Sequence, residues 1–227
     1  MTAAFAETVG APAVVRAEAT AIISSVVSGR INELPYEEGA EFKEGDVLAR
    51  IDCAVLDAET EALRAEKDAA FSRSNSLQRL LRSGGIGKAE VEAAEAMSLA
   101  AEAKLTAAKI TLKGCVIEAP FDGKLSEYSV NRYEFVEQSK PMFSIVSSGK
   151  PELEIIAPDT WLRWIAVGKT GQIQLDAAVG TYEISVTGVA PVVDPVSRTV
   201  KLSAVFTGNA SGILPGMSGR VLFEDDR

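Results

Sequence analysis

Few residues in this chain are suited to chemistry, and their types argue against catalysis. The sequence contains no histidine, which removes the commonest general base and the commonest transition-metal ligand. Two cysteines and four scattered methionines do not form a site for soft metal ions. Gly168-Lys169-Thr170 resembles the end of a phosphate-binding loop, but Arg163 stands where the first glycine of that motif belongs. We therefore expect no enzyme activity, no bound metal and no cofactor.

Composition and charge also limit the partners. The 227 residues are 47% hydrophobic and 24% charged, which is enough material for about two or three small hydrophobic cores. The formal net charge is -9 at pH 7. An acidic surface repels a phosphate backbone, and no basic cluster interleaved with aromatic residues offsets that repulsion, so we expect no nucleic-acid partner. No stretch reaches the roughly 18 apolar residues that a membrane-spanning helix needs.

A long helical segment occupies the middle of the chain. From residue 53 to about residue 82, Ala, Leu, Glu, Lys and Arg dominate without Pro or Gly, and a second such stretch runs from residue 88 to about residue 113. Only about five residues connect them, so the two helices must run antiparallel, as a rod on the order of 40 Å long. The expected seam positions are Leu56, Thr60, Leu63, Lys67, Ala70, Ser74, Leu77 and Leu81 in the first helix, and Val91, Ala94, Ser98, Ala101, Leu105, Ala108 and Leu112 in the second.

Two β-type segments, residues 26–52 and 115–146, flank the helices and resemble each other. Both are punctuated by glycines, which are expected where the backbone needs positive φ or a close approach. The helical rod is thus an insertion into a small, carrier-like β-domain. The residues expected to shape its turns are Gly29, Gly39, Gly45, Asp46, Pro120 and Gly123.

The last third of the chain has the pattern of a small antiparallel barrel. Short β-branched stretches alternate with turn signals from residue 152 to residue 223. Pro215-Gly216-Met217 combines a stiff turn with a flexible thioether that fills a gap. Arg198 follows Asp194-Pro195 in a turn-like run, and its expected role is structural, in an ion pair or a bridge to a carbonyl.

Taken in this order, the parts resemble the periplasmic adaptor, or membrane fusion, family of RND-type tripartite efflux pumps. The resemblance implies a mainly β fold with a long α-helical hairpin: a lipoyl-like (barrel-sandwich hybrid) domain, an antiparallel coiled-coil hairpin and a small antiparallel β-barrel. The expected boundaries are a flexible N-terminus at 1–13, the lipoyl-like domain at 23–52 and 115–148, the hairpin at 53–114, and the β-barrel domain at 14–22 and 149–227.

The resemblance also implies a function. It predicts a non-catalytic subunit in the periplasm, associated with the inner membrane, that bridges an inner-membrane RND transporter and an outer-membrane channel. A homo-oligomer is expected, as a hexamer in the assembled pump. Covalent carrier activity is not expected, because the rod replaces the hairpin whose tip lysine accepts the cofactor in carrier domains. Two alternatives are an adaptor of an ABC-type exporter and a structural module that associates with itself.

In this family the tip of the rod is expected to contact the channel through Arg, Leu and Ser. Aligned on the paired leucines, Leu80 matches the Leu and Ile86 its apolar companion, but Ser76 replaces the Arg and Gly87 replaces the Ser. The alternative is that these residues only end the helices and face solvent. The predicted docking residues are Arg79, Leu80, Ile86 and Gly87.

The two cysteines lie at the ends of the rod. Cys53 and Cys115 are about 32 and 30 residues from Gly85 at the tip, so antiparallel pairing brings them close together. In an oxidising periplasm they form a disulfide or remain buried thiols that pack as small apolar groups. A bond requires Cα atoms within about 7 Å.

The first residues carry one further signal. Ala4-Phe5-Ala6 has the A-x-A form of a signal-peptidase site. The start of the chain is therefore either the stub of a trimmed export signal or a short disordered segment.

Overall fold

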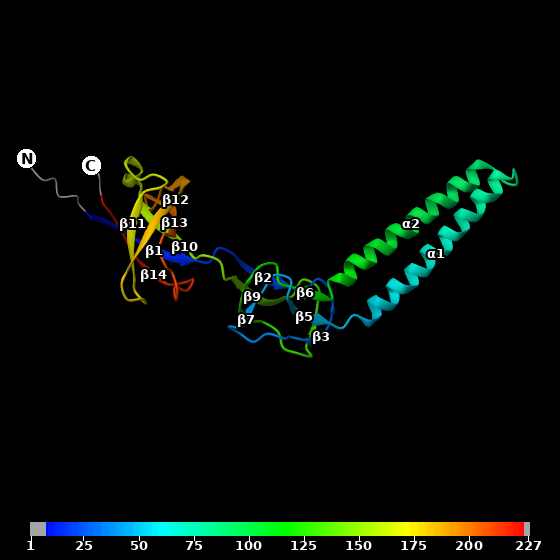
Figure 1. The fold of residues 1–227 in the computed structure, drawn as a ribbon, viewed down its shortest axis with the longest axis horizontal. Helices are drawn as coiled ribbons and strands as arrows, with labels where there is room; N and C mark the ends of the chain where they lie inside the picture. The colour runs from blue at the N-terminus through cyan, green and yellow to red at the C-terminus, as the bar shows by residue number, and fades with distance from the viewer. Residues whose placement is uncertain (1–7, 225–227) are drawn as a thin grey trace, which may run out of the picture. The chain divides into compact units, whose positions relative to one another are not determined.

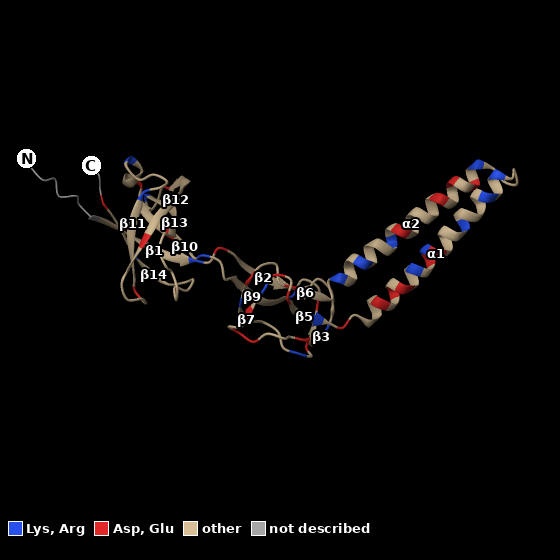
Figure 2. Cartoon of the chain, viewed as in Figure 1, with Lys and Arg blue, Asp and Glu red and all other residues tan. Residues whose placement is uncertain are grey.

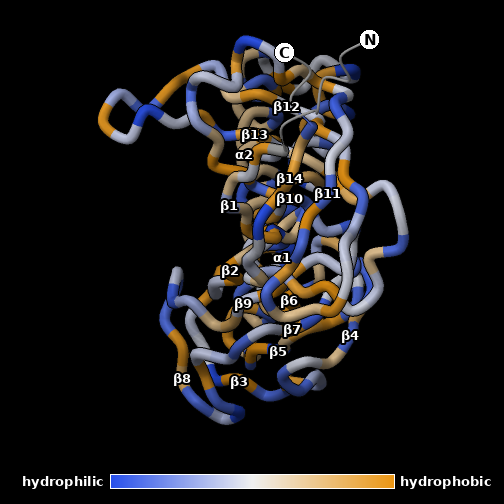
Figure 3. Tube along the Cα trace, turned by 90° about the vertical axis from the view of Figure 1, so that its left-hand side faces the viewer, coloured by the Kyte–Doolittle hydropathy of each residue, from blue (hydrophilic) through white to orange (hydrophobic). Residues whose placement is uncertain are grey.

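The computed structural model describes residues 8–224, which fold as two units. One unit runs from Ala21 to Ile145, and the other combines the described residues up to Thr20 with those from Val146 onward. The Ala4-Phe5-Ala6 motif, and residues 1–7 of the expected flexible N-terminus, lie outside the described residues. Figure 3 shows many hydrophobic residues along the strands of each unit and hydrophilic colours over many loops.

Two four-stranded sheets form the sandwich (Figure 1). Each sheet mixes strands from before and after the helices, so the two β-type halves join as one domain. The core between the sheets contains the fully buried Leu48, Leu125 and Phe143. One sheet has the order β2 (Thr20–Ser24), β9 (Pro141–Ser147), β7 (Gly123–Tyr128), β4 (Glu41–Phe42), and the other has the order β6 (Val116–Glu118), β5 (Val47–Ile51), β3 (Gly29–Glu33), β8 (Phe135–Val136).

The helical hairpin leaves the sandwich after β5 and returns to it at β6. Helix α1 covers Ala54–Arg82 and helix α2 covers Lys88–Lys113. The side chains buried between the helices are Thr60 and Ser74 from α1, and Val91, Ala94, Ala101 and Leu105 from α2. All six are seam positions expected from the heptad spacing.

The second unit is a closed six-stranded barrel. Its core includes Trp161, whose ring lies 5.8 Å from that of Phe223 in an edge arrangement. Trp161 belongs to a short 3-10 helix, η1 (Asp159–Arg163). The strand order is β1 (Thr8–Arg16), β10 (Glu152–Pro158), β13 (Thr199–Phe206), β12 (Thr181–Asp194), β11 (Thr170–Leu175), β14 (Ser218–Glu224). The predicted fold class is thereby confirmed.

Two expected boundaries were wrong near the start of the chain. Residues 8–13 are not a flexible terminus but part of β1, because they pair with β14 from Thr8↔Glu224 onward. Small residues such as Ala11 and Ala13 are buried there in the barrel core. The segment predicted to belong to the barrel, residues 14–22, also extends too far, because β2 starts at Thr20 and belongs to a sandwich sheet beside β9.

Candidate functional site

The tip of the hairpin begins at Gly84, which follows the C-terminal end of α1. Gly84 has a φ of 76°, a left-handed conformation that glycine adopts without steric cost. Its N–H donates to the Leu81 carbonyl at 3.0 Å, and the N–H of Gly85 donates to the Leu80 carbonyl at 2.9 Å. This pair of bonds is a Schellman motif, which satisfies the last carbonyls of a helix. The chain then reverses within a few residues.

The four residues predicted to dock a channel all lie at this tip. Arg79 and Leu80 are in the last turn of α1, Ile86 is in the connection, and Gly87 is the N-cap of α2. The Leu80 side chain is 47% exposed, and Arg79 is exposed while Ile86 is half-buried. Arg79 Nη2 donates to Ser76 Oγ at 3.2 Å. The tip thus presents an apolar side chain beside a cation, and its docking role remains a prediction.

Two hydrogen bonds between side chains connect α1 and α2 along the hairpin. Gln78 Nε2 donates to Glu95 Oε1 at 2.6 Å near the tip. Lys104 Nζ donates to Glu66 Oε1 at 3.0 Å nearer the base. Both pairs are exposed, so each contributes little to stability, but together they define which residues of α1 and α2 lie at the same level.

A disulfide closes the base of the hairpin. Cys53 and Cys115 are bonded, with Cα atoms 6.1 Å apart. The backbone around them is also tied to the sandwich: the Ile51 N–H donates to the Cys115 carbonyl, and the Asp52 N–H donates to the Arg30 carbonyl, both at 2.8 Å. Covalent and hydrogen bonds therefore fix the segments that enter and leave the helices.

The predicted turns of the two sandwich halves bond to each other. The Gly45 N–H donates to the Ala119 carbonyl, and the Ala119 N–H donates to the Asp46 carbonyl, both at 2.9 Å. Gly45 has a φ of 83°, as does Gly39. Pro120 is exposed directly after Ala119. Gly123 starts β7 opposite Phe42, and Gly29 starts β3 opposite Val136.

Asp46 is the polar centre of one of these turns. Its Oδ2 accepts the Lys43 N–H at 2.8 Å and the Tyr36 hydroxyl at 2.9 Å. These bonds favour the carboxylate, so the Lys43 N–H first, and the Tyr36 hydroxyl second, lower the pKa of Asp46. Tyr128 donates its hydroxyl to the Tyr36 carbonyl at 2.7 Å. Neither tyrosine can be predicted from the sequence as a partner of these turns, because nothing local signals a partner 10 or 92 positions away.

Asp46→Asn is expected to weaken the acid sensitivity of the sandwich unit. Because the pKa of Asp46 lies below its ordinary 3.8 in the folded protein, the unfolded chain binds more protons around that pH. The ionised Asp46 carboxylate therefore stabilises the folded protein at pH values above its ordinary pKa. This stabilisation is lost as the pH falls through the lower pKa of Asp46 in the folded protein. Thermal unfolding measured from about pH 5 to about pH 2 should show a shallower decline for the variant. If thermal stability declined as steeply with falling pH in the variant as in the wild type, this role of Asp46 would be contradicted. Glu59→Gln, at an exposed position, serves as the control variant.

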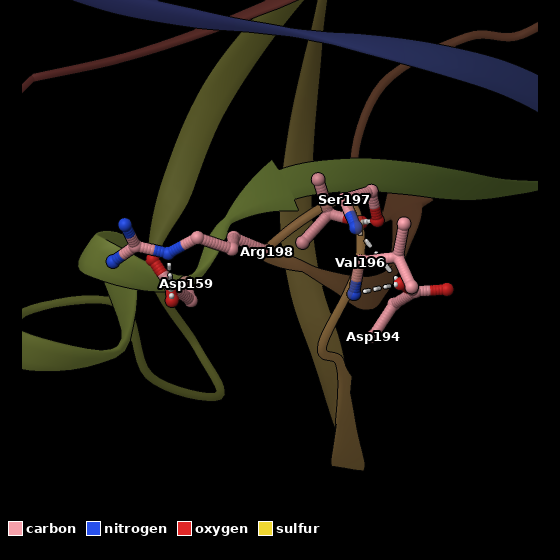
Figure 4. Close-up of polar contacts among 6 residues, drawn as sticks. Asp159, Asp194, Val196, Ser197 and Arg198 are labelled. Carbon is pink, nitrogen blue, oxygen red and sulfur yellow. Dashed lines mark hydrogen bonds and ion pairs between the residues drawn. The ribbon is translucent and has the colours of Figure 1, made fainter.

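The turn between β12 and β13 is held by Asp194 and Arg198 (Figure 4). Asp194 Oδ1 accepts the N–H groups of Val196 and Ser197, each at 2.9 Å, and these bonds, that of Ser197 first, lower the pKa of Asp194. Arg198 has a φ of 54°, and its Nε lies 3.4 Å from Asp159 Oδ2 on η1. Because the Arg198 side chain is 75% exposed, this ion pair contributes about 0 to 1 kcal/mol. Its geometry is that of a structural bridge between turn and helix.

The Pro215-Gly216-Met217 turn is tied to the first barrel strand. Gly216 has a φ of 93°, and the Met217 N–H donates to the Leu214 carbonyl at 3.2 Å, the pattern of a type II turn. The Gly216 N–H donates to the Val15 carbonyl at 2.9 Å, and the Val15 N–H donates to the Met217 carbonyl at 2.8 Å. The motif thus anchors β14 to β1.

No cluster of three or more His, Cys, Asp or Glu residues that could hold a metal ion occurs between residues 8 and 224. Within the same range, neither helix combines the length and hydropathy required to cross a bilayer.

Comparison with known proteins agrees with this architecture. An "Antibiotic efflux pump periplasmic linker protein ArpA" of Pseudomonas putida is 28% identical over 207 residues, covering 84% of this chain and 56% of the relative. The "Toluene efflux pump periplasmic linker protein TtgA", also of Pseudomonas putida, is 28% identical over 207 residues, covering 84% and 54%. The chain spans about half the length of the curated relatives it matches.

The fold is shared with solved structures. A MacA-MexA chimeric protein, containing the Pseudomonas aeruginosa MexA α-hairpin domain, matches with a TM-score of 0.85 at 19% identity, over 97% of this chain and 81% of that one. The family model "RND MFP, barrel-sandwich hybrid domain" matches residues 19–148, the stretch that holds both sandwich halves and the hairpin. The chain therefore belongs to the RND membrane fusion protein family.

Proposed function

We propose that this chain is the adaptor part of a tripartite RND efflux system, which bridges an inner-membrane transporter and an outer-membrane channel. The observation that carries the proposal is its membership of the RND membrane fusion protein family, together with a helical hairpin that extends from a sandwich of paired halves. The names of the relatives, periplasmic linker proteins of antibiotic and toluene efflux pumps, support the same role.

In this role the chain acts through geometry rather than catalysis. Helix α2 has 26 residues, which at the usual rise makes a rod of about 40 Å. The disulfide and hydrogen bonds at its base fix the direction of the rod relative to the sandwich. Its tip carries Arg79, Leu80, Ile86 and Gly87 to the channel, while the sandwich and barrel provide surfaces for the transporter.

The proposed location is the periplasm, in association with the inner membrane. A bonded cysteine pair suits that location, because disulfides persist in oxidising compartments. The working form in this proposal is a homo-oligomer, hexameric in the assembled pump. An RND transporter is preferred to an ABC-type exporter as the partner because the matching family model is that of the RND proteins.

Affinity purification of the tagged full-length protein from solubilised, mildly cross-linked cell envelopes tests the proposal. Co-purification of an RND transporter and an outer-membrane channel is the expected result. An ABC-type exporter in their place would contradict the RND assignment. Recovery of the chain alone, in self-associated form, would contradict the adaptor role and favour a structural module.

A further inference from the structure

The loop between β13 and β14 carries a motif that the adaptor role does not use. Residues 209–211 read Asn209-Ala210-Ser211. This is the N-x-S/T pattern that accepts N-linked glycans when the middle residue is not proline. The chain has four asparagines, and the other three lack a Ser or Thr two positions later. The motif therefore distinguishes Asn209 from every other asparagine of the chain.

The fold presents this motif with its two polar residues outward. The middle residue, Ala210, packs against the barrel core, and Ile213 is buried in that core. The Ile213 N–H donates to the Ala210 carbonyl at 3.2 Å, and Gly212 turns the chain between them with a φ of 82°. Asn209 and Ser211 are both exposed. Because apolar contacts hold the loop on either side of Ser211, the folded protein itself exposes the asparagine.

Within the motif, the serine is bonded to the amide oxygen of the asparagine. Asn209 Oδ1 accepts the Ser211 N–H at 3.0 Å and the Ser211 hydroxyl at 2.6 Å, as in an Asx turn. Asn209 Nδ2 donates no hydrogen bond to any residue between 8 and 224. An amide nitrogen is a weak nucleophile because its lone pair is delocalised into the carbonyl group. Two donors on the oxygen make an Nδ2 proton easier to remove, and the nitrogen is left available for attack on a sugar.

Open space adjoins the asparagine on two sides. Asn209 lines a hollow of about 370 Å³ together with residues 148–151, and a second hollow of about 210 Å³ together with Tyr182. Residues 202–219 contain no charged side chain, so this stretch is tan in Figure 2 and no ion pair of its own holds the loop. The two hollows give room for a bulky group on Asn209, and the Tyr182 ring offers an apolar surface to the first sugar.

We propose that Asn209 is an N-glycosylation site, modified in the periplasm by a transferase that uses an oligosaccharide linked to a polyprenyl diphosphate. The bond from Asn209 Nδ2 to the anomeric carbon of the first sugar forms as the bond from that carbon to the diphosphate oxygen breaks. One Nδ2 proton passes to a base of the transferase, and the polyprenyl diphosphate leaves with the bonding electron pair. The inference rests on the proposed function only for the periplasmic location, with which the bonded cysteine pair agrees.

Mass spectrometry of the tagged full-length protein, purified from the cell envelopes of its own host, tests the proposal. Trypsin cleaves after Lys201 and Arg220, so residues 202–220 form one peptide that contains the whole motif. The mass of this peptide should exceed that of the bare sequence by the mass of an oligosaccharide, and electron-transfer fragmentation should locate the added mass at Asn209. Recovery of the bare peptide alone would overturn the proposal, as would an added sugar on a serine or threonine of the peptide instead.

Three variants check that the motif directs the modification. Ser211→Ala keeps the asparagine but removes the hydroxyl, so the glycan should be lost, whereas Ser211→Thr should retain it. Asn131→Gln, which changes an exposed asparagine outside the motif, should leave the glycan at Asn209 in place. Persistence of the glycan in Ser211→Ala would contradict the proposal. The measurement needs neither transporter nor channel, so its result is separate from that of the envelope co-purification.

Discussion

Replacing both cysteines by alanine is expected to lower the free energy of unfolding of the sandwich and hairpin unit by about 4 kcal/mol in the chain-entropy model. The disulfide joins residues 62 positions apart, so its loss releases a long loop in the unfolded chain. The effect belongs to this unit alone, because Cys53 and Cys115 both lie between Ala21 and Ile145.

Urea unfolding followed by helical circular dichroism measures this loss, because α1 and α2 lie in the same unit. Wild-type protein in reductant should resemble the double variant, and reductant should leave the double variant unchanged. A loss below about 1 kcal/mol would contradict this expectation, because packing of the two helices would then keep the base of the hairpin closed without the disulfide.

Gly29→Val is expected to destabilise the same unit by about 3 kcal/mol, the upper part of the range for overpacking. A Cβ at Gly29 would lie 2.6 Å from Ile51 Cγ2 and 2.7 Å from the Asp52 carbonyl oxygen. Both distances are far below van der Waals contact, and the second involves backbone that cannot rotate away. The substitution would therefore push β3 from β5 directly beneath the start of α1.

Gly87→Val is the matched control. A Cβ there meets nothing within 4 Å, and the residue has an extended φ of -82°. Its free energy of unfolding should change by less than about 1 kcal/mol. Equal losses for the two variants in the same urea titration would show that the close approach at Gly29 does not govern stability.

Much of the hairpin could be predicted from the sequence because its interactions are local and periodic. The heptad spacing identified Thr60 and Ser74 as seam residues despite their polarity, and both are buried. The proximity of the cysteines followed from antiparallel pairing about a short connection. Gly39 and Gly45 could be assigned to turns because positive φ is costly for other residues.

The parts that sequence reasoning missed depend on distant partners. Residues 8–13 include Gly10, Ala11 and Pro12, which have low strand propensity, and they form β1 only because β14 lies beside them. The φ of 54° at Arg198 is not typical of arginine and is supported by the surrounding turn. For the docking site, the sequence located the tip but not its mode of contact, because Ser76 and Gly87 depart from the family pattern.

Photo-cross-linking in living cells tests the central claim, that the hairpin tip contacts an outer-membrane channel, most directly. A photoreactive amino acid is placed at Leu80 at the tip or at Val55 near the base, both exposed on α1, in the full-length protein. An adduct with the channel is expected from Leu80, and none is expected from Val55. An absence of channel adducts from Leu80, with the protein present at its normal level, would contradict it.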